Sequence, residues 1–219
     1  MITFHNVILL IAAYLMGSMP FAVWIGQLFY KIDVREFGSG NAGATNTMRV
    51  LGKKAGISVL VLDVLKGVGA VMLVGLGHNY QVNTESYVNL QLVLGISALF
   101  GHIFPIYAGF RGGKGIATLL GVVIAIEPSA ALYSSVIFIV VLFLTRYVSL
   151  SSMIASTVFP LYIIFISKSE ILSLIIFSLF ITFLVILTHQ KNIERLIRRE
   201  ESKIFTKNQN IDDDDEVDD

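Results

Sequence analysis

The sequence predicts an all-α integral membrane protein with about seven transmembrane helices. Of its 219 residues, 55% are hydrophobic and only 15% are charged, whereas soluble domains are roughly 25% charged. The mean hydropathy is +0.75. Several apolar stretches also approach or exceed the roughly 20 residues that a helix needs to cross the hydrocarbon core.

Six stretches are the main candidates for spans, and short polar segments separate them. They occupy residues 4–30, 55–77, 88–108, 129–146, 148–167 and 170–188. No Lys or Arg precedes the first stretch, whereas a cleavable signal peptide has a basic start, so we expect this span to be retained. Residues 115–126 are apolar but short. They fit either a short tilted span or a re-entrant helix.

The distribution of basic residues favours counting residues 115–126 as a span. Lys and Arg accumulate in cytoplasmic segments of membrane proteins. With seven spans, Lys168 is the one basic loop residue outside, whereas with six the charges after residue 126 fall on both faces. We therefore expect an outside N-terminus, a cytoplasmic C-terminus, and cytoplasmic positions for residues 38–49, 109–115 and 189–203.

The segments between the spans are too short to form a soluble domain. Residues 1–204 are therefore predicted to be a single membrane-embedded domain. Residues 205–219 end in IDDDDEVDD, and such a run of like charge predicts a disordered acidic tail. The chain has no Cys, which excludes disulfides, thiolate catalysis and Cys-ligated metals. His and carboxylate residues with metal-ligand spacing are missing as well.

The first polar stretch, residues 38–49, reads GSGNAGATNTMR. Gly and small polar residues let backbone N–H groups turn towards an anion, and Arg49 adds a planar fork that suits phosphate. Gly38, Gly40 and Gly43 match G-x-G-x-x-G, and Asp63 follows at dinucleotide-site spacing. However, no strand precedes the glycines and Asp63 lies in an apolar span. The stretch therefore predicts a phosphate-binding loop, with a ligand-free flexible loop as the alternative.

The second polar stretch, residues 110–121, reads FRGGKGIATLLG. Glycines flank Lys114 just before a predicted helix, and a helix N-terminus offers free N–H groups and a positive dipole end. The pattern lacks the spacing of a Walker A motif, so it does not specifically indicate a nucleotide. The alternative is a pair of basic side chains that snorkel at a helix end.

The third polar stretch, residues 188–204, has the helical spacing of an interfacial amphipathic helix. His189 and Asn192 are three residues apart and would share one helix face at the exit of the last span. A site role for both is favoured over a purely structural one. Anionic lipid attraction explains most of the basic residues of this stretch, at about 1 kcal/mol each.

Charged and polar residues within or beside the spans are further candidates. Asp63 and Lys66 lie three apart in an apolar helix, where charge is expensive, so an intrahelical pair with a supporting role is expected. His102 is expected to line the same cavity as the polar stretches. Near Arg146, one of Ser149, Ser151 and Ser152 could donate to a phosphate, or these serines could simply cap a helix.

Taken together, these motifs resemble the bacterial acyl-phosphate-dependent glycerol-3-phosphate acyltransferase family. The resemblance rests on GSGNAGATNTMRVLGKKAG, LDVLKG, GHIFPIYAGFRGGKGIATLLG, RYVSLSS and HQKNIERL followed by Glu201, in this order over residues 14–204. Gln190 and Arg199 depart from the family pattern, in which Arg and Gly are frequent at these positions.

The resemblance implies a seven-helix membrane enzyme with no cofactor and no metal. Its reaction would move an acyl group from acyl phosphate to the 1-hydroxyl of sn-glycerol 3-phosphate, giving lysophosphatidate and phosphate, the first step of phospholipid synthesis. The implied location is the bacterial plasma (inner) membrane, with the active site on the cytoplasmic face. The expected partners are these two substrates and membrane lipids, with no nucleic acid.

From the residues and the resemblance together we expect three groups of site residues. Those expected to be catalytic are Ser39, Arg49, Lys114, His189 and Asn192. Those expected to bind substrate or phosphate are Gly38, Gly40, Asn41, Gly43, Thr45, Asn46, Gly112, Gly113, Gly115 and Ser152. Asp63, Lys66 and Glu201 are expected to give structural support. His189 is expected to orient a substrate rather than act as general base, and both roles remain open.

Two other classes of function fit parts of this sequence. A transporter for a phosphorylated solute would also have apolar spans with glycine breaks, but its polar residues would gather at the midplane, and an internal repeat would be expected. A structural membrane scaffold leaves the polar residues of 38–49 unexplained. The gathering of polar stretches on one face favours the enzyme.

Overall fold

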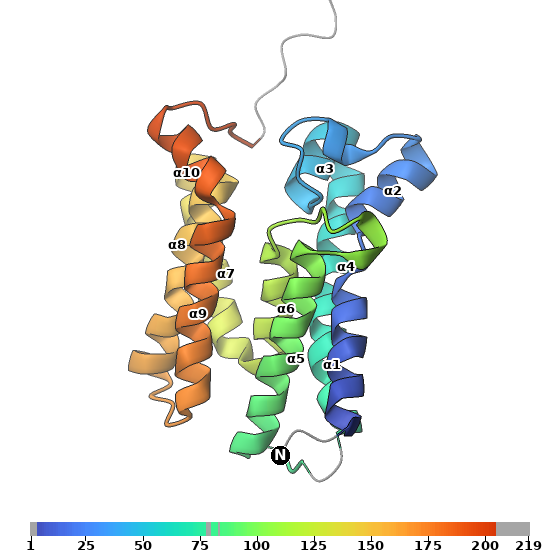
Figure 1. Ribbon diagram of the computed structural model, residues 1–219. Coiled ribbons are helices and arrows are strands. Elements are labelled where there is room, and N and C mark those ends of the chain that lie inside the picture. Colours follow the sequence, from blue (N-terminus) through green and yellow to red (C-terminus); the bar gives the residue numbers. More distant parts are fainter. Residues whose placement is uncertain (1–3, 78–79, 83, 205–219) are drawn as a thin grey trace, which may run out of the picture.

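The computed structural model describes residues 4–77, 80–82 and 84–204, and the regular elements in these ranges are all helical (Figure 1). The α-helices are α1 (Phe4–Gly17), α2 (Phe21–Tyr30), α3 (Ala44–Leu51), α4 (Lys53–Met72), α5 (Glu85–Ile103), α6 (Ile116–Ile126), α7 (Pro128–Thr145), α8 (Val148–Leu161), α9 (Leu172–Thr188) and α10 (Gln190–Ile197). The short 3₁₀ helices are η1 (Val34–Glu36), η2 (Leu73–Leu76) and η3 (Ile106–Ala108), and η4 (Tyr162–Ile166) is a π-helical segment that follows α8. The predicted all-α fold is confirmed for the described residues, and the predicted acidic tail lies outside them.

Within the part of the chain that the structure describes, four helical segments are long and apolar enough to cross a membrane by themselves. They are Lys53–Leu76, Glu85–Ala108, Pro128–Thr145 and Val148–Ile166. The bent pairs α1–α2 and α9–α10 raise the number to six if each pair is one span, and α6 is a shorter apolar helix. The structure therefore supports a multi-pass membrane protein.

Two predicted segments differ from the structure in a specific way. The stretch 4–30 is not one continuous helix, because α1 ends at Gly17 and α2 starts at Phe21 with a bend of 41°. Pro20 lies in the break, and a proline disfavours helical backbone in the residue before it. The amphipathic helix expected over 188–204 ends at Ile197. Arg199 has a left-handed φ of 60°, and the chain turns back there.

The helices form two groups in Figure 1, with α1, α4, α5 and α6 on one side and α7, α8 and α9 on the other. A core of buried apolar side chains connects them, including Val122 of α6, Phe159 of α8 and Ile181 of α9. The α2–α3 segment and α10 lie at the same end of the molecule, opposite the start of α1 (Figure 1). The three polar stretches therefore meet at one end.

Helices α4 and α6 pack closely because each presents a glycine to the other. A Cβ built on Gly67 would meet the backbone oxygen of Thr118, and one built on Gly121 would meet the backbone oxygen of Val64. Small residues allow such close approach between membrane helices. This contact holds α6, and with it the glycine-rich segment that precedes α6, against α4.

We expect Gly121→Ala to destabilise the protein by about 1–3 kcal/mol, because the added methyl group meets backbone that cannot move aside. In detergent solution, the thermal unfolding midpoint should fall by about 2–4 °C per kcal/mol. Gly75→Ala is the matched control, since an added Cβ there meets nothing within 4 Å. An unchanged midpoint for Gly121→Ala would contradict the proposed close packing.

Candidate active site

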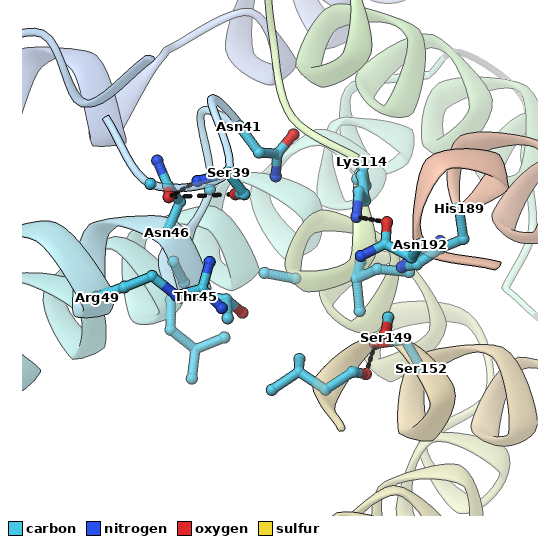
Figure 2. A pocket seen from close by; sticks show the side chains of 18 of the residues that line it. Ser39, Asn41, Thr45, Asn46, Arg49, Lys114, Ser149, Ser152, His189 and Asn192 are labelled. Carbon is cyan, nitrogen blue, oxygen red and sulfur yellow. Dashed lines mark hydrogen bonds between the residues drawn. The ribbon is translucent and has the colours of Figure 1, made fainter. Parts of the chain in front are cut away.

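A polar cavity of about 310 Å³ lies at the end of the molecule where the polar stretches meet. Most of its lining residues come from the loop before α3, from α3, from the start of α6, from α8 and from the segment 189–202, and α4, α5 and α7 add a few more (Figure 2). The predicted residues among them are Gly38, Ser39, Asn41, Gly43, Thr45, Asn46, Arg49, Asp63, His102, Lys114, Gly115, Ser152, His189, Asn192 and Glu201. The sequence-based expectation of one shared cavity therefore agrees with the geometry.

Asn46 determines the shape of the loop that forms the first wall. Its side chain is buried, and its Oδ1 accepts hydrogen bonds from the backbone N and the Oγ of Ser39, at 2.8 and 3.1 Å. Its Nδ2 donates to the carbonyl oxygens of Val34 and Phe37, at 2.7 and 3.1 Å. Gly38 has a left-handed φ of 61° and packs against Asn46, so only glycine fits there without strain. Asn46 thus acts as an internal support rather than an open ligand.

Arg49 extends from the last turn of α3 into the same wall (Figure 2). It is exposed, and among the described residues no carboxylate or hydrogen-bond acceptor pairs with its guanidinium. An unpaired arginine beside a cavity suits a planar oxyanion such as phosphate.

Lys114 forms the second wall and bridges to the third. Its Nζ donates a hydrogen bond to Oδ1 of Asn192 in α10. The pKa of Lys114 is lowered to about 8, mainly by burial; the charge of Glu201 opposes this shift, and the positive charges of Arg195 and Arg49 add to it. The ammonium group is therefore largely charged at neutral pH but loses its proton more easily than an exposed lysine.

Gly112 and Gly113, expected to bind phosphate, instead pack behind the Lys114 segment. The backbone N–H of Gly113 donates to the carbonyl of His102 at 3.2 Å, and a side chain at either glycine would collide with His102. Neither they nor Gly40 line the cavity. Gly112 and Gly113 permit a close approach between α5 and the segment that carries Lys114.

His189 lies at the 59° bend between α9 and α10. It is buried, and its Nδ1 is 2.8 Å from the carbonyl oxygen of Val185, which assigns the ring proton to Nδ1 and leaves Nε2 as an acceptor. Burial and the nearby charge of Lys114 lower the pKa of His189 to about 4. The imidazole is therefore neutral at physiological pH and a weak base.

Glu201 holds the third wall together. Its carboxylate accepts hydrogen bonds from Ser149 at 2.6 Å, from Asn192 at 2.6 Å and from Arg195 at 2.8 Å. Burial raises the pKa of Glu201, but these hydrogen bonds outweigh burial and hold the pKa below its usual value. The supporting role expected for Glu201 agrees with this geometry. Sequence reasoning did not predict that the chain returns towards α8 after α10. The backbone N–H of Ile204 donates a hydrogen bond to the carbonyl oxygen of Arg146 at 2.9 Å.

A buried polar cluster lies beneath the cavity. Lys66 and Asp63 form the expected pair, with 2.8 Å between Nζ and Oδ1, and Lys66 also donates to the carbonyl of Met19 at 2.8 Å. Nδ1 of His102 lies 3.1 Å from Oγ1 of Thr118 and 3.6 Å from Asp63. Pairing of this kind offsets the cost of burying charge among apolar helices.

Three helices, α3, α6 and α8, begin at the cavity. Gly43, Gly115 and Val148, at or next to their first residues, line it, and none of the three N-termini has a side-chain cap. Uncapped N-termini leave backbone N–H groups free and place the positive ends of three dipoles beside Arg49 and Lys114. Ser152, one turn into α8, donates its own hydroxyl proton to Val148 at 2.9 Å. The arrangement is suited to binding anions.

An apolar cavity of about 540 Å³ adjoins the polar one. The two cavities share a wall that contains Thr45, Leu60, Ile116, Phe138 and Ser152. The apolar cavity continues from this wall between α6, α7 and α8 and is lined mainly by aliphatic and aromatic side chains. A polar cavity suited to anions and a hydrocarbon-like cavity therefore lie side by side, with part of their lining in common. Among the described residues, no group of three or more metal-ligating side chains is present.

The family model described as glycerol-3-phosphate acyltransferase matches residues 7–199. A protein of Enterococcus faecalis named glycerol-3-phosphate acyltransferase is 44% identical over 205 residues, which cover 90% of this chain and 91% of that protein. A protein of the same name from Listeria monocytogenes is 44% identical over 202 residues, covering 92% of this chain and 98% of that protein.

Two solved structures are similar as well. They are crystal structures of PlsY (YgiH), an integral membrane glycerol 3-phosphate acyltransferase, in its glycerol 3-phosphate form and its lysophosphatidic acid form. The TM-scores are 0.81 and 0.78, with 36% identity and coverage of 91% of this chain and 95% of each crystallised chain.

The pKa of Lys114 predicts how anion binding depends on pH. Because the lowered pKa lies at about 8, the charged ammonium is present below that pH and is lost above it. Sulfate keeps a constant charge, so its affinity, measured by equilibrium dialysis in detergent, should fall as the pH rises above about 8 towards the ordinary lysine pKa. Lys114→Arg should remove this dependence, because arginine stays protonated. Equal pH profiles for both proteins would contradict the assignment.

Proposed function

This chain belongs to the glycerol-3-phosphate acyltransferase family, and from that membership we propose the acyl donor, the residue roles and the membrane orientation of its reaction. The chain is a membrane-integral enzyme that acylates glycerol 3-phosphate to lysophosphatidate. The proposed donor is acyl phosphate, and the proposed acceptor group is the 1-hydroxyl.

The observation that carries this proposal is the pair of adjoining cavities, one suited to anions and the other apolar, which share part of their lining. Acyl phosphate has the same division, with a phosphate at one end and a hydrocarbon chain at the other. The phosphate fits the N-terminus of α3 beside Ser39 and Arg49, and the acyl chain fits the cavity between α6, α7 and α8. The Lys114 side then receives the phosphate of glycerol 3-phosphate.

The chemistry of acyl phosphate suits a site that is rich in cations and weak in bases. An acyl phosphate is a mixed anhydride with a good leaving group, so positioning and charge stabilisation supply most of what the reaction needs. The 1-hydroxyl oxygen attacks the carbonyl carbon, and the bond between that carbon and the phosphate oxygen breaks. The hydroxyl proton passes to an oxygen of the departing phosphate, which leaves as inorganic phosphate.

Within this reaction His189 is proposed to orient the acceptor. With its proton on Nδ1 and directed to Val185, Nε2 accepts the hydrogen bond of the substrate hydroxyl. A pKa of about 4 argues against removal of that proton by the imidazole itself. Asn192, between Lys114 and Glu201, keeps the lysine aimed into the cavity.

The proposed membrane arrangement has seven spans in one domain, residues 1–204, with α6 as the short span. The N-terminus lies outside, and the end formed by α3 and α10 faces the cytoplasm of a bacterial cell. The support for this orientation is the concentration of basic residues at that end, which include Arg49, Lys53, Lys54 and Arg195.

An assay of the purified protein in detergent tests the proposed reaction. Supplied with acyl phosphate and sn-glycerol 3-phosphate, it should form lysophosphatidate and inorganic phosphate in equal amounts. Arg49→Ala should reduce turnover by about a hundredfold or more, as loss of a charge-stabilising group does, while the protein remains folded. Product formed from an acyl thioester, with acyl phosphate left intact, would refute the donor assignment. Glycerol 3-phosphate counterflow in liposomes without any product would indicate a transporter.

The role of His189 predicts different results for two substitutions. His189→Ala removes the acceptor nitrogen, and kcat should fall by about a hundredfold, in the range of a lost positioning or acid–base group. His189→Gln offers an amide oxygen in a similar place and should recover much of the lost rate if orientation is the role. Failure of every hydrogen-bonding substitution to restore activity would favour a general base.

A further inference from the structure

Arg35, in the η1 turn between α2 and α3, lies outside the cavity and is tied to two separate parts of the chain. Its Nε and one terminal nitrogen donate to both oxygens of Asp33, at 2.6–3.1 Å. The other terminal nitrogen donates to the carbonyl oxygens of Ala108 and Arg111, at 2.8 and 3.3 Å. One guanidinium therefore connects the α2–α3 segment to the segment that follows η3.

The side chain of Arg35 is mostly buried, and these contacts occupy its hydrogen-bond donors. The side chains of Arg35 and Asp33 are only 14% and 16% exposed. Its charge is balanced by Asp33, whose pKa the hydrogen bond from Arg35 holds below the usual value. This contrasts with Arg49, which has an open guanidinium beside the cavity. This geometry therefore argues against a direct contact between Arg35 and a substrate.

The two segments that Arg35 connects each carry proposed phosphate-binding groups. On one side, the carbonyls of Val34 and Phe37, which flank Arg35, accept hydrogen bonds from Asn46, and Asn46 also holds Ser39. On the other side, Arg111 is three residues before Lys114. The separation between the Ser39 loop and the Lys114 segment is therefore controlled in part through Arg35.

We propose that Arg35 is a positioning residue that fixes the separation between the loop 37–43 and the segment 105–115, so that the two substrate phosphates lie at the distance that acyl transfer requires. The proposal rests on the function proposed above. Its physical basis is the sensitivity of reactions between two bound substrates to geometry, where a displacement of about 1 Å can cost a hundredfold in rate. Each loop alone would still bind its phosphate.

The conservative substitution Arg35→Lys tests the forked geometry. Lysine keeps the positive charge but has one nitrogen, so it cannot hold both Asp33 and the two carbonyl oxygens. We expect kcat to fall by about ten- to a hundredfold, with KM for either substrate changed much less. Arg198→Ala is the matched control, because Arg198 is also ion-paired, with Glu194 at 2.7 Å, but is highly exposed and does not line the cavity. Its kcat should stay at the wild-type value.

Other outcomes would overturn the proposal. A rise in KM for glycerol 3-phosphate with unchanged kcat would mean that Arg35 binds substrate directly. A lower unfolding temperature with an unchanged kcat per folded molecule would mean that Arg35 only stabilises the fold. The wild-type enzyme is measured first, with whichever acyl donor it accepts. An inactive wild-type enzyme would contradict the proposed function rather than the role of Arg35.

A distance measurement tests the link without any need for activity. The natural chain has no Cys, so Glu36→Cys and Ile106→Cys, both at exposed positions, allow two nitroxide labels to be attached selectively. Double electron–electron resonance should give a narrow distance distribution with Arg35 present and a broader or shifted one with Arg35→Ala. Identical distributions would refute the positioning role.

Discussion

The hydrogen bonds that run from Lys114 through Asn192 to Glu201 are the interaction on which the rest of the site depends. Lys114 belongs to the helix group of α1, α4, α5 and α6, whereas Asn192 and Glu201 follow α9. The carboxylate also binds Ser149 and Arg195. A partly buried carboxylate with three donors is stable when charged. Its negative charge opposes the lowering of the Lys114 pKa, and its hydrogen bonds join both sides of the cavity.

The electrostatics of the cavity follow from this connection. Glu201 is already occupied by its donors, and His189 is neutral. The charge left facing the cavity is therefore positive, from Arg49 and Lys114, and three uncapped helix N-termini add to it. Among the described residues that line the cavity, the carboxylates of Asp63 and Glu201 are both paired, with Lys66 and with Arg195. The unpaired positive charge therefore favours a bound oxyanion such as phosphate.

Sequence reasoning identified the site where the signal was local. The run of small polar residues at 38–49, the glycines beside Lys114 and the pair His189 and Asn192 all belong to segments that meet at the cavity. Sequence reasoning was less informative where contacts between distant segments determine the role of a residue. Gly112 and Gly113 looked like anion ligands but allow close packing on His102. Arg35 gave no signal, because its distant partners are backbone carbonyls, which any residue supplies.

The shared wall between the cavities explains why acyl transfer suits this fold. Helices α6 and α8 begin at the polar cavity and continue beside the apolar one, so each helix presents free N–H groups at its start and aliphatic side chains further along. An amphiphile bound along these helices has its phosphate and its first methylene groups fixed together, which places the bond to be broken at the boundary. In the proposed reaction, the same boundary would then hold lysophosphatidate, with its hydrocarbon chain already in the apolar cavity when phosphate leaves. With this proposed placement the acyl chain would not have to cross water. The free energy of keeping it buried, about 0.8 kcal/mol per methylene group, would favour retention of both donor and product at the membrane.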